Sequence, residues 1–256
     1  MQPNKPYFEV SIISKSSKKR KIIFLIVSIL LIISILIYTC LKIFYVIDTG
    51  ALNSRTYHYI YVETDALDAT SAEKFANTFR VRGAAGLTLK IDGKWRVLLS
   101  LYPDLEAAQS VSKQLSTSGT TTKISSITTA RIHTSKMNEQ QKSTAKNIYE
   151  HYIETIDLLY NTSIALDSST MTESSAQVRV NQLLLLWQQR TQTLANTIDI
   201  TSKKASEHAL IEVYNLSMQI TGLLAFLADE NDYSTSLLTY TSIARKTTLL
   251  LAQISF

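Results

Sequence analysis

The sequence has very little cysteine, proline or glycine: one, three and six residues respectively among 256. The single cysteine, Cys40, lies inside a long apolar run, so the rest of the chain cannot form a disulfide within itself. Exported bacterial domains often lack disulfides, whereas eukaryotic ectodomains commonly contain them. The cysteine content therefore favours a bacterial envelope protein.

Residue patterns that support catalysis or cofactor binding are also missing. The four histidines have no metal-ligand spacing, and neither a glycine-rich phosphate loop nor a serine nucleophile motif is found. Glu150, Glu154 and Asp157 lie one turn apart in a helical pattern and could serve glycosidase chemistry, although such acids more often form a solvated helix face. We expect no enzymatic activity, no metal and no cofactor.

The most informative feature present is an unbroken membrane-compatible run at residues 22–41, directly preceded by the basic segment 15–21. Twenty helical residues at about 1.5 Å per residue span the roughly 30 Å hydrocarbon core. A cleaved signal peptide is the alternative, but its apolar core would be shorter. The sequence predicts a basic tail at 1–21, a transmembrane anchor at 22–47 and a linker at 48–56.

Charge is distributed unevenly along the chain. Residues 1–47 carry a net charge of +6, and the remainder carries −1. The positive-inside rule predicts a single-pass protein with a cytoplasmic N-terminus and extracytoplasmic domains after about residue 48. The basic segment adjoins the bilayer and suits anionic lipid, so nucleic acid is not an expected partner.

Residues 57–130 alternate between strand and helix patterns. A strand at 57–62 precedes a helix at 70–80, a second strand at 87–91, the turn dipeptide Asp92-Gly93 and a third strand at 95–101. A helix after Asp104 and a strand at 122–127 complete the block. The β-α-β-β-α-β order predicts a ferredoxin-like α+β domain, with two helices on one face of a four-stranded sheet.

Three segments of this block are distinctive: the strand KWRVLLSLY at 94–102, the following helix at 104–115 with its paired alanines, and the strand YIYV at 59–62. With these segments the block resembles a SPOR (sporulation-related repeat) domain. SPOR domains bind peptidoglycan, especially glycan strands stripped of their stem peptides. The resemblance therefore implies glycan strands as a partner, at sites of wall remodelling.

Strand periodicity predicts where a glycan would bind. If Ile60, Val62 and Val97 face the helices, the alternate residues lie on the opposite, open sheet face. Aromatic rings and polar groups there could form a sugar-stacking platform. The alternatives are that tyrosine is simply a favoured strand residue, or that the C-terminal region covers this face. The predicted glycan-binding residues are Tyr57, Tyr59, Tyr61, Thr88, Lys90 and Arg96.

Residues 135–256 show helical periodicity almost throughout. Apolar residues recur every three or four positions, and polar clusters near 167–170, 201–204 and 229–232 interrupt them. We expect an all-α domain, a four-helix bundle with its own core, which folds separately from 57–130. The stretch 211–227 contains Glu212, Asn215 and Gln219, so it is not expected to be a second membrane span.

Two functional hypotheses follow. In the first, the SPOR-like domain binds glycan and localises the protein to a septum during sporulation or division; the layout is similar to the stage II sporulation protein B type. In the second, the SPOR-like domain has lost glycan affinity, and the sheet and bundle bind other envelope or septal proteins as an assembly module. Binding to denuded peptidoglycan sacculi distinguishes the two hypotheses.

Overall fold

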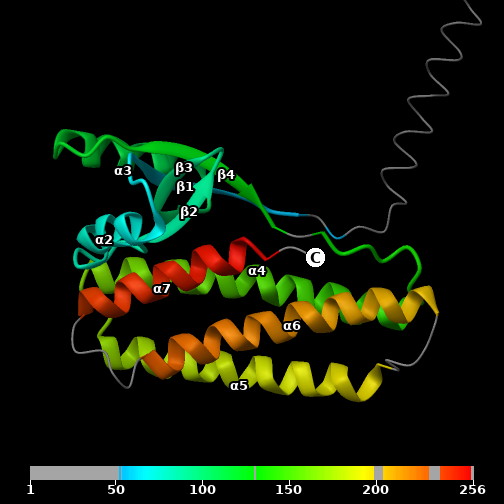
Figure 1. Cartoon of the computed structure of the whole chain (residues 1–256). Coiled ribbons are helices and arrows are strands. Elements are labelled where there is room, and N and C mark those ends of the chain that lie inside the picture. The colour runs from blue at the N-terminus through cyan, green and yellow to red at the C-terminus, as the bar shows by residue number, and fades with distance from the viewer. Residues whose placement is uncertain (1–51, 53, 130, 199–203, 231–236, 255–256) are drawn as a thin grey trace, which may run out of the picture. The chain divides into compact units, whose positions relative to one another are not determined.

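The computed structural model describes residues 52, 54–129, 131–198, 204–230 and 237–254. The predicted tail at 1–21 and anchor at 22–47 lie outside the described residues. Residues 51–256 form one compact unit with mixed α+β content. Its elements run in the order β-α-β-β-α-β and then four long helices, as Figure 1 shows.

The first block contains a four-stranded antiparallel sheet with strand order β2-β3-β1-β4. The predicted element order in this block is confirmed. The strands and helices are β1 (Thr56–Thr64), α2 (Ala69–Arg80), β2 (Leu87–Ile91), β3 (Lys94–Tyr102), α3 (Leu105–Thr117) and β4 (Lys123–Thr128).

Local sequence signals explain where these elements begin and end. The carboxylate of Asp68 accepts a hydrogen bond from the Ser71 backbone N–H at the start of α2, and Asp104 does the same for α3. Asp92 and Gly93 both have positive φ, as a two-residue hairpin turn requires. Gly86 is also left-handed, and a Cβ there would lie 2.4 Å from Cγ of Arg80.

Both faces of the sheet are buried. The face that packs on α2 and α3 carries the residues predicted to face the helices. Ile60, Val62, Val97 and Leu99 belong to one hydrophobic cluster with Ala76 and Ala108. A β-bulge in β3 interrupts the register, because Ile60 is opposite Ser100 whereas Tyr61 is opposite Leu98. The extra residue moves Leu101 onto the same face as Leu98.

The second block consists of four helices that pack side by side, which we call the bundle (Figure 1). The predicted apolar stripes form its core, and Tyr152, Ile156, Trp187 and Leu216 are fully buried. The helices are α4 (Glu139–Asp167), α5 (Glu173–Thr197), α6 (Ala205–Glu230) and α7 (Leu237–Ala252).

Helix α6 is, among the described residues, the one helix long and apolar enough to cross a membrane. Its segment Ser206–Asp229 has a mean hydropathy of 1.4. Val213, Leu216 and Ile220 of this helix are fully buried in the bundle core. Packing against the neighbouring helices accounts for part of its apolar character, because 39% of the apolar window is buried whereas Met218 and Phe226 are exposed.

Candidate functional site: the tyrosine face of the sheet

The second face of the sheet carries the three predicted glycan-binding tyrosines, and we call it the tyrosine face. Tyr57, Tyr59 and Tyr61 do lie on one face, opposite the face that packs on α2 and α3. Their exposed fractions are only 1%, 8% and 7%. The expectation of an open face is therefore wrong, and the alternative that the C-terminal region covers it describes the structure.

The cover is provided by the bundle. The three tyrosines, Leu98 and Leu101 belong to a single hydrophobic cluster that continues through residues of α4, α5, α6 and α7. Helix α7 also contacts β3 and α2 directly. One continuous core thus joins the two blocks, which favours folding as one unit over the separate folding of 57–130 and 135–256 that the sequence predicts.

Several polar groups between the two blocks are paired. The Tyr57 hydroxyl donates a hydrogen bond to Oδ1 of Asp157 on α4, at 3.0 Å, and Arg55 forms an ion pair with the same carboxylate. Thr129, just after β4, shares a hydrogen bond of 2.9 Å with the Tyr149 hydroxyl. The contact between sheet and bundle therefore satisfies the hydroxyl groups of Tyr57, Thr129 and Tyr149.

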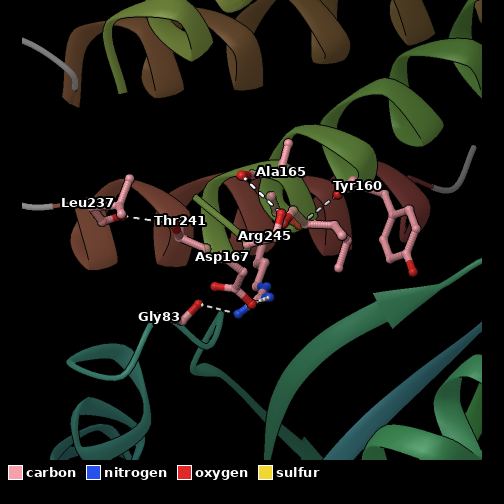
Figure 2. A network of polar contacts seen from close by, with 10 residues as sticks. Gly83, Tyr160, Ala165, Asp167, Leu237, Thr241 and Arg245 are labelled. Carbon is pink, nitrogen blue, oxygen red and sulfur yellow. Dashed lines mark hydrogen bonds and ion pairs between the residues drawn. The ribbon is translucent and has the colours of Figure 1, made fainter. Parts of the chain in front are cut away.

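A second polar contact lies where the turn after α2 meets the bundle, as Figure 2 shows. Arg245 on α7 donates a hydrogen bond to the carbonyl oxygen of Gly83 at 2.9 Å and pairs with Asp167 at the end of α4. Ser242 donates a hydrogen bond to the carbonyl oxygen of Ala84 at 2.7 Å. These contacts link a loop of the first block to two helices of the second.

Arg96 is the predicted site residue that does join the tyrosines. Its guanidinium lies 4.9 Å from the ring centroid of Tyr61, and its side chain is 17% exposed. Glu63 lies beside it and forms an ion pair with Lys123 at 2.6 Å. Arg96 and Tyr61 therefore form one edge of the tyrosine face, next to a charged rim.

Thr88 and Lys90 lie on the opposite face, so their predicted grouping with the tyrosines is wrong. Directly paired residues in an antiparallel sheet share a face, and Thr88 is opposite Val97, which faces the helices. Thr88 accordingly donates a hydrogen bond to Glu73 of α2. Lys90 is exposed, with its ammonium 5.7 Å from the centre of the Trp95 ring.

The acids singled out in α4 are each engaged with a basic or phenolic partner. Glu150 pairs with Lys146 and Glu154 with His151, while Asp157 binds Arg55 and Tyr57. Among the described residues no group of three or more His, Cys, Asp or Glu side chains could hold a metal ion. The sequence had not indicated the Arg55–Asp157 or Arg245–Asp167 pairs, because their members are far apart in the chain.

Burial of Tyr57 predicts a loss of stability at high pH. Desolvation, and next the Asp157 carboxylate, raise the pKa of Tyr57 far above its usual value near 10.0. Above pH 10 the Tyr57 hydroxyl ionises in the unfolded state but stays protonated in the folded state. Its contribution to the free energy of unfolding is therefore fully present below pH 10 and is lost as the pH rises. We expect Tyr57→Phe to reduce this loss by about 1.4 kcal/mol per pH unit. Urea unfolding between pH 9 and about pH 12 measures it, and an unchanged dependence would contradict the burial.

Comparisons with protein families, curated proteins and solved structures identify no relative of this chain. No family model matches the chain, and no curated protein or solved structure matches it significantly.

Proposed function

We propose that the chain is a single-pass bacterial membrane protein whose exported part is a protein-binding assembly module of the cell envelope. The +6 segment before the apolar run supports a cytoplasmic N-terminus. The strand order β2-β3-β1-β4, with antiparallel neighbours throughout, supports a ferredoxin-like, SPOR-like arrangement for 57–130. In this proposal the protein is not an enzyme.

The observation that favours assembly over glycan binding is the cover on the tyrosine face. A glycan strand needs exposed ring surface for stacking, and the tyrosines are at most 8% exposed. Reaching them would require separating the bundle from Leu98 and Leu101, which are 0% and 1% exposed. The cost of exposing this surface opposes glycan binding at the predicted residues.

Sedimentation with denuded peptidoglycan sacculi tests this proposal. We expect the full chain in detergent to remain in the supernatant, at the level of an unrelated membrane protein with a basic tail. The matched variant is Arg96→Gln, which changes the edge of the tyrosine face while leaving its rings in place. Retention of the wild-type chain that Arg96→Gln weakens would contradict the proposal and restore glycan binding by the sheet.

A further inference from the structure

A hollow lies on the bundle between the N-terminal half of α4 and the C-terminal half of α5, away from the tyrosine face. Its volume is about 830 Å³, within the range of sites that hold small ligands. A second hollow, of about 560 Å³, also lies between α4 and α5, and Leu186 lines both. The two hollows therefore adjoin along one helix seam.

The larger hollow has an unusual lining. Most of its residues carry amides or hydroxyls, Leu186 supplies exposed apolar surface, and Arg190 is its one charged residue. In the described part of the chain, the side-chain amides of Asn147 and Gln189 make no hydrogen bond with protein. Each amide offers both a donor and an acceptor, as does each peptide group of a bound chain.

Arg190 is held beside a buried ring, and the carboxylate of Glu154 lies near enough to act on its charge without forming an ion pair with it. Its guanidinium lies 5.5 Å from the ring centroid of Trp187, and the Trp187 ring is fixed by a 2.9 Å hydrogen bond from Nε1 to Thr155. No hydrogen bond or ion pair joins the Arg190 guanidinium to another described residue. Burial lowers its pKa and the charge of Glu154 opposes that shift, yet an arginine stays protonated at neutral pH.

These features favour a peptide carboxylate over a sugar as ligand. A guanidinium binds a carboxylate through two parallel hydrogen bonds, and partial burial strengthens such bonds. Sugar sites usually present an aromatic ring for stacking, but the lining contains no aromatic residue, and Trp187 beneath Arg190 is 0% exposed. The free amides suit the backbone of an extended segment.

We propose that this hollow binds an extended segment of a partner protein and that Arg190 holds a carboxylate of that segment. The inference rests on the proposed assembly function and gives it a location and a ligand chemistry. Asn147 and Gln189 hydrogen-bond the backbone of the segment, and the apolar surface accepts its side chains.

Trp187 offers a direct readout, because Trp95 is the other of the two tryptophans. In a Trp95→Phe background, the full chain in detergent is titrated with acetylated tetra-L-alanine bearing a free carboxylate. We expect a saturable change in Trp187 fluorescence with the acid, and roughly tenfold weaker binding of the matching C-terminal amide, because it lacks the charge-assisted bonds. Arg190→Gln should remove the preference for the acid.

The matched control is Arg82→Gln, which removes the same charge from an exposed position after α2. It should leave the titration unchanged, and thermal unfolding of Arg190→Gln should show an intact fold. The inference is overturned if neither peptide gives a saturable change or if Arg190→Gln responds as wild type. These results do not depend on sacculus retention, so this inference and the proposed function can fail separately.

Discussion

A fragment that spans residues 51–130 should show no cooperative unfolding transition, whereas the unit 51–256 should unfold cooperatively. Without the bundle, the fragment exposes the tyrosine face, including Tyr57, Leu98 and Leu101. Burial of each large apolar side chain stabilises a protein by about 1.5–3 kcal/mol. Several such losses approach the total stability of a typical domain, about 5–15 kcal/mol.

Thermal denaturation followed by far-ultraviolet circular dichroism measures this result. A domain of this size also buries a smaller fraction of its surface on folding than a larger domain does, so it has little stability to lose. As a complement, mixing the fragment with separately produced 135–256 should restore the transition, because the missing half of the core is supplied in trans. A fragment that melts as sharply as the whole unit would show that the sheet does not need the bundle.

Replacing both Tyr59 and Tyr61 with alanine should destabilise the protein strongly. Large aromatic residues cost about 3–5 kcal/mol each when truncated to alanine in a core. The two rings lie 5.8 Å apart, so their effects should not simply add. We expect a total loss of about 5 kcal/mol, which lowers the Tm of a protein of this size by roughly 10–20 °C.

The control for the tyrosine pair is Lys90→Ala with Lys94→Ala, two exposed positions on the neighbouring hairpin. Surface substitutions of this kind usually change stability by less than about 0.5 kcal/mol. Calorimetric melting of the two double variants compares a covered face with a solvent-exposed one. Similar melting temperatures for both variants would mean that the tyrosines are in water.

The elements of the fold could be predicted from sequence because their signals are local. Asp68 and Asp104 mark helix starts within three residues, and Asp92-Gly93 specifies a hairpin turn by itself. Strand alternation correctly separated Ile60 and Val62 from the tyrosines. None of these inferences requires knowledge of residues distant in the chain.

The environment of the tyrosine face could not be predicted in the same way. Alternation assigns a residue to a face, but what covers that face depends on contacts such as that of Tyr57 with Asp157, 100 residues later. Leu98, on the same face, was the available signal, since a leucine amid tyrosines is more typical of a core than of a sugar platform. The error at Thr88 and Lys90 was avoidable, because the two-residue turn at Asp92-Gly93 sets the register of β2 with β3 and places Thr88 opposite Val97.

The most direct test of the account is a double-mutant cycle between Tyr57 of the sheet and Asp157 of the bundle. Tyr57→Phe and Asp157→Asn each remove one partner of the 3.0 Å hydrogen bond. If the bundle covers the tyrosine face in solution, the free energies of unfolding should show a coupling of about 1 kcal/mol or more between the two positions. Additive effects, with a coupling indistinguishable from zero, would contradict the packing of the bundle on the sheet.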